Sequence, residues 1–245
     1  MEFKGSGTVL QNLSYRAERF VNYYPLIKVI QMLPTSLEDK TVLIINAGTG
    51  LEAEFFSRQG ARVTVTDISD VAVEALLKEC PCLSSRIEDS ENLSFEDGSF
   101  DWVMVNNGLH HLARPMKGIY EMERVAREGF IFIEAQDSFF MRLLIWLGVI
   151  NAYEDGPGNY TYRFTKHDVK RLSESLCFKY IIHTAWCQEY VPLFNKFIYP
   201  YLNGKKGFWL FKKAFYLGNF MFGRWGNKFI AIIIKSSERL DSKCR

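Results

Sequence analysis

The sequence predicts an α/β protein built on a doubly wound, mostly parallel sheet. The first observation is the stretch Val42–Ile45 (VLII), whose unbroken apolar character is typical of a strand buried on both faces of such a sheet. The second is the stretch Asn46–Gly50 (NAGTG), where glycines follow this strand and a helical pattern begins at once. The third is the alternation of strand-like and helix-like segments from residue 41 to residue 134, which favours strand–helix–strand crossovers.

Local signals mark the ends of the predicted elements in this first part. Pro34 stops the first helix, Gly60 ends the second, and Ser69 or Asp70 caps the third. Gly129 leads from the fourth helix into another apolar strand. In chain order, the predicted elements are a helix from about Asn12 to Leu33, a strand at 41–45, a helix to about Arg58, a strand at 61–66, a helix at 71–79, a short strand near 85–87, a strand at 100–105, a helix at 115–127 and a strand at 130–133.

The second part of the chain is less regular. An almost wholly apolar stretch, Ser138–Ile150, is followed by a loop, and Thr165 then caps a helix that runs to about Leu176. Two further strands are predicted at 179–185 and 229–234, with a long aromatic insertion at 186–225 between them. The sheet is therefore expected to have seven strands.

Composition and charge restrict the class of protein. The 245 residues are 48% hydrophobic and 24% charged, which is ordinary for a globular protein with a substantial core. A formal net charge of +2 argues against a general affinity for nucleic acid. The five cysteines match no disulfide scaffold or zinc module, so we expect them to be reduced and the protein to be cytoplasmic. We also expect neither a signal peptide nor a membrane span, which needs roughly 18 apolar residues.

The glycine-rich junction predicts a nucleotide-type cofactor. Glycines let the chain turn tightly and let a ligand lie against the backbone, and the following helix offers free N–H groups. Asp67 ends the second strand, where its carboxylate can accept hydrogen bonds from both ribose hydroxyls. Dinucleotides and S-adenosylmethionine are both bound in this way. The dinucleotide fingerprint is incomplete, because Asn46 and Leu51 stand where it has its first and last glycines.

Further motifs favour the second cofactor. They are the acidic stretch Glu88–Phe95, the turn Asp97–Asp101 (DGSFD), the stretch Asn107–Leu112 (NGLHHL) and the pair formed by Glu121 and Arg124. Together with the glycine-rich junction, they resemble the class I S-adenosylmethionine-dependent methyltransferases, especially the subgroup with small-molecule acceptors. The resemblance covers about residues 41–134. It implies a Rossmann-like fold, S-adenosylmethionine as cofactor and methyl transfer as the reaction.

The resemblance also implies a set of cofactor-binding residues. These are Asn46, Gly48, Thr49, Gly50, Asp67, Ile68, Asp89, Ser90, Asn106 and Asn107. The bend at 48–50 would pass under the methionine and ribose, and Asp67 would hold the ribose hydroxyls with Ile68 on the adenine. Asp89 would accept from the adenine amino group with Ser90 beside the ring, and the two asparagines would border the methionine and the sulfonium. Taken alone, Asp67 could cap a helix and Asp89 could shape a turn. The assignment as cofactor-binding residues depends on all of these residues occurring together at these spacings.

Two positions depart from the pattern of the family, which usually has an acidic residue at Ile44 and a glycine at Asn46. Asparagine tolerates the positive φ that glycine would supply there. The missing acid is either replaced by side chains of the N-terminal helix or leaves cofactor binding weaker. The candidate replacements are Arg16, Arg19, Tyr23 and Tyr24. A non-catalytic, methyltransferase-like scaffold protein is therefore an alternative, and a dinucleotide-dependent oxidoreductase is a less favoured one.

His110 and His111 follow the fourth strand and are the candidate catalytic residues. Either could act as a general base near neutral pH, or the pair could only shape its loop. Glu134 ends the fifth strand and either faces the acceptor or bonds to a loop. No metal site is expected, since no cluster with metal-ligand spacing stands out.

The acceptor must be recognised mainly by the second part of the chain. Arg163 could bind an anionic acceptor or form a structural ion pair. The stretch Lys205–Leu217 mixes lysines with large aromatics, which resembles an interfacial membrane helix and equally fits a helix packed over an apolar pocket. Peripheral membrane contact through 205–223 is thus one expectation. Both interpretations favour a bulky, partly apolar small molecule over a nucleic acid as the acceptor. The expected reaction is methylation of this acceptor at oxygen.

These expectations describe one methyltransferase domain spanning residues 1–245. Residues 1–40 would form a helical cap, 41–134 the cofactor-binding half and 135–165 a lid insertion. Residues 166–245 would complete the sheet and carry the aromatic insertion at 186–225. The sequence gives no indication of the oligomeric state.

Overall fold

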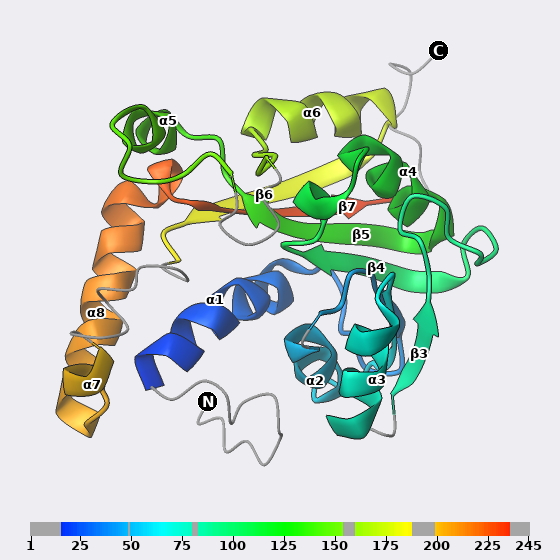
Figure 1. Ribbon diagram of the computed structural model, residues 1–245, viewed down its shortest axis with the longest axis horizontal. Helices are drawn as coiled ribbons and strands as arrows, with labels where there is room; N and C mark the ends of the chain where they lie inside the picture. Colours follow the sequence, from blue (N-terminus) through cyan, green and yellow to red (C-terminus); the bar gives the residue numbers. More distant parts are fainter. Residues whose placement is uncertain (1–15, 49, 80–82, 154–159, 188–198, 236–245) are drawn as a thin grey trace.

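A computed structural model describes residues 16–48, 50–79, 83–153, 160–187 and 199–235 (Figure 1). Its centre is one seven-stranded sheet in the order β3-β2-β1-β4-β5-β7-β6. The strands are β1 (Thr41–Ile44), β2 (Arg62–Asp67), β3 (Ser84–Ile87), β4 (Phe100–Asn106), β5 (Ala126–Ala135), β6 (Lys179–Ala185) and β7 (Lys228–Ile234). Neighbouring strands from β3 to β5 are parallel, and β7 pairs antiparallel with both β5 and β6. The prediction of a mostly parallel, seven-stranded Rossmann-like sheet is confirmed.

Helices cover both faces of this sheet. They are α1 (Arg16–Met32), α2 (Leu51–Ser57), α3 (Asp70–Glu79), α4 (Pro115–Val125), α5 (Phe139–Trp146), α6 (Lys166–Ser175), α7 (Tyr199–Leu202) and α8 (Lys205–Phe222), with the 3₁₀ turns η2 (Leu109–His111) and η4 (Gly223–Trp225). Buried side chains of α1, α2 and α3 form one core with one face of the sheet, and those of α4 and α6 form a second core with the other face. Figure 1 shows the two layers below and above the strands.

Element boundaries differ from the sequence prediction mainly at one junction. The helix expected to reach residue 127 ends at Val125, because Ala126 is already extended and pairs with Phe100 on the neighbouring strand. β5 is therefore longer than the predicted strand at 130–133. The cap at Thr165 is confirmed as a capping box, in which Thr165 and Asp168 bond to each other's backbone N–H groups.

Of the two cysteines that the structure describes, one differs from the expectation. Cys177 is disulfide-bonded, whereas Cys187 is free and buried. Cys187 packs in a small apolar cluster with Val21, Tyr24 and Ala185, beside which lie aromatic residues of α8. The expectation that all cysteines are reduced is therefore wrong for Cys177.

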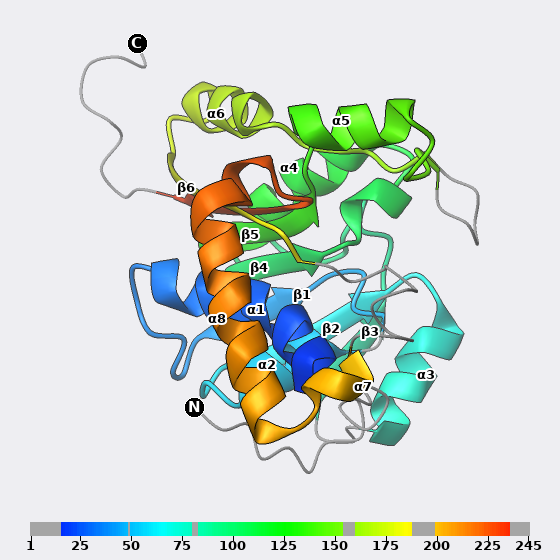
Figure 2. The ribbon, with the colours of Figure 1, turned by 90° about the vertical axis from the view of Figure 1, so that its left-hand side faces the viewer.

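The aromatic insertion is described from residue 199 onward, and its main element is α8. This helix lies beside α1, as Figure 2 shows. The ring of Phe20 on α1 makes edge contacts with rings of α8, at centroid distances of 6.0 Å to Phe208 and 5.2 Å to Phe215. Within the described part of the chain, no helix combines the length and the apolar character needed to cross a bilayer.

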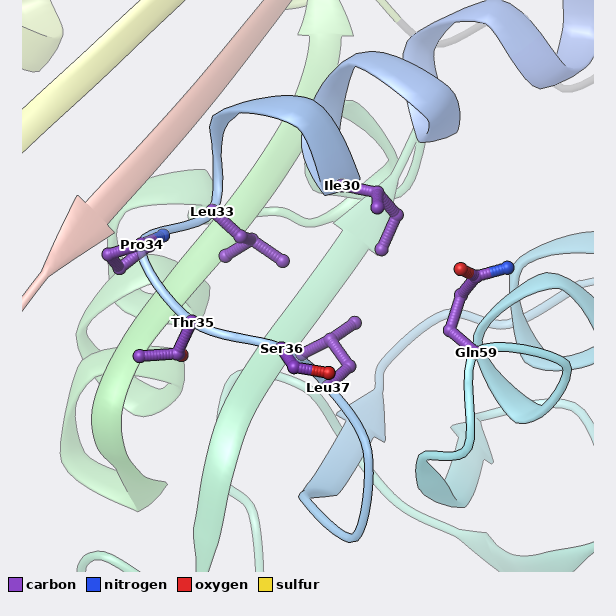
Figure 3. Close-up of a pocket in the computed structure, with 7 residues that line it drawn as sticks. All are labelled: Ile30, Leu33, Pro34, Thr35, Ser36, Leu37 and Gln59. Carbon is purple, nitrogen blue, oxygen red and sulfur yellow. The ribbon is translucent and has the colours of Figure 1, made fainter.

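One cavity lies at the amino ends of the strands. It has a volume of about 290 Å³ and is formed by the end of α1, the loop before β1 and Gln59 (Figure 3). In open parallel sheets, ligands bind at the opposite, carboxyl ends of the strands. This cavity is therefore separate from the candidate functional site.

Candidate active site

The glycine-rich bend follows β1 directly and faces the end of β2. Gly48 and Gly50 have φ values of 47° and 74°, in the left-handed region that favours glycine, and Gly50 is the N-cap of α2. The N–H of Gly48 donates to Oδ2 of Asp67 at 3.1 Å, and the N–H of Ser69 donates to Oδ1 at 3.0 Å. The carboxylate at the end of β2 is thus held against the bend. Thr49 lies outside the described residues, and the side chain of Ile68 is exposed.

Asn46 joins three segments at the edge of the sheet. Its φ is 51°, so it adopts the backbone conformation for which the family usually has glycine. Its side-chain Nδ2 donates to the carbonyl of Gly108 at 3.0 Å, and its Oδ1 accepts from the hydroxyl of Ser90. A Cβ at Gly108 would lie 2.5 Å from Val105 and 2.7 Å from Asn46, so only glycine allows this close approach. The polar side chain at 46 therefore supplies contacts that a glycine could not make.

The acidic stretch after β3 is fixed to α4. Asp89 is exposed and shapes a turn, because its Oδ1 accepts from the N–H of Glu91 at 2.8 Å. Arg124 donates to the carbonyls of Leu93 and Phe95, and Glu121 accepts from the N–H of Leu93. The hydrogen bond from Arg124 holds the pKa of Glu121 below its usual range, with desolvation acting against it. The pair Glu121 and Arg124 therefore positions the segment that carries Asp89 and Ser90.

The last residue of the DGSFD motif, Asp101, lies at the opposite edge of the sheet, where the parallel strands begin. Oδ2 of Asp101 accepts from the backbone N–H and the hydroxyl of Thr41, at 2.8 and 2.9 Å, and this ties the starts of β1 and β4 together. Desolvation opposes ionisation of this carboxyl group, but the bonds from Thr41 and Arg127 outweigh it and lower the pKa of Asp101. The motif is structural here.

A buried carboxylate that the sequence analysis missed lies at the start of α2. Nδ2 of Asn106, at the end of β4, donates to Oε1 of Glu52 at 2.5 Å, and Glu52 is almost fully buried. Oδ1 of Asn106 is buried and has no hydrogen-bond partner in the described part of the chain. Ile44 is buried in the apolar core and offers no charge. Burial raises the pKa of the Tyr23 hydroxyl on α1, and the negative charges of Glu54 and Glu52 add to the shift.

Asn107 and Glu134 fix the loop after β4. Asn107 has a φ of 53°, and its Oδ1 accepts from the buried Nζ of Lys228 at 2.5 Å. Oε1 of Glu134 accepts from the N–H groups of Gly108 and Leu109 at 2.8 and 2.7 Å, and its Oε2 lies 2.7 Å from Nδ1 of His110. Of the two alternatives for Glu134, the structure shows the bond to the loop.

The two histidines differ in their surroundings. His110 is buried against Glu134, whereas His111 is exposed, and their ring centroids are 4.3 Å apart. Arg163 donates to the carbonyls of Thr161 and Asn151, both at 3.2 Å, so its described bonds stabilise its own loop. Among the described residues, no three His, Cys, Asp or Glu side chains come together in a way that could hold a metal ion.

The geometry fits a nucleoside cofactor with an amino-acid tail. A Cβ built at Gly48 would meet nothing within 4 Å, so space is open at the bend beside Asp67. The unpartnered Oδ1 of Asn106 is an acceptor at the end of β4. Ser90 and Asn46 bring the acidic stretch to the same edge. Of the sequence-predicted residues, Asn46, Gly48, Asp67, Ser90 and the two asparagines are thus placed along one edge of the sheet.

Comparisons with known proteins identify relatives of this chain. The family described as "Methyltransferase domain" matches residues 43–133. A demethylmenaquinone methyltransferase of Beutenbergia cavernae is 34% identical over 97 residues, which are 40% of each chain. A ubiquinone/menaquinone biosynthesis C-methyltransferase of Ralstonia pickettii is 29% identical over 140 residues, 49% of this chain and 57% of that one. The chain therefore spans only about half the length of these curated relatives.

Solved structures show the same fold over most of the chain. A S-adenosylmethionine-dependent methyltransferase of Thermotoga maritima, described as a possible histamine N-methyltransferase, has a TM-score of 0.59 and 18% identity, and the match covers 89% of this chain and 98% of that one. The magnesium protoporphyrin IX methyltransferase of Synechocystis, solved with bound S-adenosylhomocysteine, has a TM-score of 0.58 and 15% identity over 96% of this chain and 90% of that one. Residues 43–133 therefore match the methyltransferase domain family, and the chain has the fold of S-adenosylmethionine-dependent methyltransferases.

Proposed function

We propose that the protein transfers the methyl group of S-adenosylmethionine to a small, bulky and partly apolar acceptor. The observation that carries the proposal is the contact of Asp67 with the open bend at Gly48, inside the segment that matches the methyltransferase family. That match supports the methyltransferase prediction over the dinucleotide-dependent alternative.

The residues of this chain would bind and orient the cofactor. When bound, S-adenosylmethionine supplies a methyl group on a positively charged sulfur, so the protein need not activate it. The bend at Gly48 would carry the ribose side of the cofactor, with its hydroxyls on Asp67. Asp89 and Ser90 would contact the adenine. The buried carboxylate of Glu52, together with Asn106, would take the place of the acid missing at Ile44 and bind the methionine ammonium.

A proton must leave the acceptor if the methylated atom is a hydroxyl oxygen. His110 is the stronger candidate base of the two histidines, because the carboxylate of Glu134 orients its ring and would stabilise its protonated form. His111 is exposed and provides the matched control. A His110→Gln enzyme should lose kcat and the acidic limb of its pH profile, while a His111→Gln enzyme should keep both. Equal activity of the two variants would leave the histidines with a role in shaping the loop only.

The acceptor would enter beside α1, α5 and α8. A groove of about 580 Å³ lies between these helices, lined by apolar side chains that include Val21, Phe140 and Phe215. Phe140 follows the end of β5 closely, and Ser138 before it donates to the carbonyl of Trp225 at 3.0 Å. The groove thus begins near the carboxyl edge of the sheet and suits an apolar ring or chain. The names of the quinone-methylating relatives agree with such an acceptor.

Two acceptor atoms are in question. Oxygen is our first proposal, with His110 as base, and carbon is the second, because the Ralstonia pickettii relative is named a C-methyltransferase. Incubating the protein with cofactor and a panel of hydroxylated quinones and phenols, followed by tandem mass spectrometry, would locate the added methyl group. Binding of S-adenosylhomocysteine in calorimetry tests the cofactor site separately. Absence of heat with both forms of the cofactor would overturn the proposal and favour a scaffold protein.

A further inference from the structure

The helix α8 has apolar side chains on two opposite faces. The inner face, with Phe208, Phe211 and Phe215, packs against Phe20 of α1. The outer face carries Trp209, Leu210, Leu217, Phe220 and Met221, all of them exposed. Phe220 is 88% exposed and Leu217 is 61% exposed. A helix packed on a soluble protein normally turns polar residues outward, so an apolar outer face indicates a further partner.

The charged side chains of α8 all have one sign. The sequence has no acidic residue between Glu189 and Glu238, and α8 itself carries Lys205, Lys206, Lys212 and Lys213. Nζ of Lys213 lies 3.7 Å from the ring centroid of Trp209, so the lysine and the aromatic ring share one surface. Aromatic side chains combined with lysines are typical of helices that lie at the boundary between lipid headgroups and acyl chains.

The short helix α5 extends the same surface. Phe139 is 77% exposed and Trp146 is 80% exposed. The ring of Phe140 contacts the ring of Trp186 at 5.5 Å, and Nε1 of Trp186 donates to the carbonyl of Phe222 at the end of α8. Figures 1 and 2 show α5 and α8 on the same side of the molecule. The two helices that carry these exposed apolar residues therefore lie on one side of the protein.

We propose that this side, formed by the outer face of α8 and by α5, binds the surface of a lipid bilayer that contains anionic phospholipids. The exposed aromatic and aliphatic side chains would enter the boundary of the acyl chains, and the lysines would contact headgroup phosphates. α8 would lie in the plane of the membrane, since its four lysines disfavour a crossing orientation. A protein partner is the weaker interpretation, because the charged residues of α8 are all lysines, which match a uniformly anionic plane better than a mixed protein surface.

Flotation with vesicles tests this proposal on the full chain. Wild-type protein should float with vesicles of phosphatidylcholine and phosphatidylglycerol, and added salt or omission of phosphatidylglycerol should weaken the binding. Leu217→Glu and Phe220→Glu change exposed positions only, and each should lower the partition coefficient about tenfold or more, from the apolar burial that is lost. Tyr120→Glu, at a half-exposed aromatic residue on α4, is the matched control and should float like wild type.

A second variant tests the charges. Lys205→Glu combined with Lys206→Glu should lower binding to the anionic vesicles while circular dichroism stays unchanged. The proposal is overturned if wild-type protein does not float, or if the Leu217→Glu and Phe220→Glu variants float as well as Tyr120→Glu. It is also overturned if sedimentation shows a dimer that Phe220→Glu dissociates while none of the proteins binds vesicles, since the surface would then join two copies of the chain.

Discussion

Replacing Asp67 by alanine removes the carboxylate on which the proposed ribose contact depends. In the structure this carboxylate accepts two backbone N–H groups, from Gly48 and Ser69. The proposed cofactor would add two hydroxyl donors. A hydrogen bond to a charged group contributes about 1.5 kcal/mol or more, so the loss of two such bonds costs about 3 kcal/mol of binding free energy. The dissociation constant should therefore rise roughly a hundredfold.

Isothermal titration calorimetry with S-adenosylhomocysteine measures this change directly. Asp70→Ala is the matched control, because Asp70 is an exposed carboxylate whose described hydrogen bond is to the N–H of the next residue, Val71. Circular dichroism and urea unfolding would show that both variants are folded. An Asp67→Ala protein that binds the cofactor as tightly as the Asp70→Ala protein would refute the placement of the ribose, and the proposed orientation of the cofactor with it.

Three further outcomes are expected. Glu52→Gln should weaken binding of S-adenosylhomocysteine about tenfold, because one charged contact to the ammonium group of the cofactor is lost. Unchanged affinity in calorimetry would show that Glu52 does not contact the cofactor. Glu134→Ala should lower the free energy of unfolding by about 3 kcal/mol, since it leaves buried donors without an acceptor, and urea titration would contradict this if the midpoint did not move. Burial, with the nearby positive charges of Lys28 and Lys166, lowers the pKa of His183. As the pH falls, His183 is therefore protonated in the unfolded chain before it is protonated in the folded protein. The free energy of unfolding should thus decrease below about pH 6.5. This part of the pH dependence should be absent in His183→Gln, as measured by urea unfolding across that range.

Periodic and local signals were enough to predict the architecture. A short apolar run that ends at glycines is typical of a strand with both faces covered, and its alternation with helical patterns favours parallel crossovers. End signals such as Pro34 and Thr165 act within a few residues, which is why the cap at Thr165 was predicted correctly. The sequence predicts the end of α4 two residues too late. The reason is that Ala126 pairs with Phe100 in the sheet, and this contact overrides the helical pattern of the local sequence.

The site was predictable only where its residues are close to the glycine-rich junction or match a family motif. Asp67 was found from its place at the end of a strand. Glu52 was missed, because nothing in the sequence distinguishes a buried glutamate from an exposed one in the first turn of a helix. Its partner Asn106 is distant in sequence, and the two meet only when β4 pairs beside β1.

The sequence by itself determined the order of strands and helices, the glycine bend and the family likeness, because these depend on residues that are neighbours along the chain. Tertiary structure alone decided which charges meet and which surfaces stay open. It brought Glu134 to His110 and Glu52 to Asn106, and it turned one apolar face of α8 to α1 and the other to solvent. The reason is that burial and pairing depend on contacts between segments far apart in the chain, which no local pattern encodes.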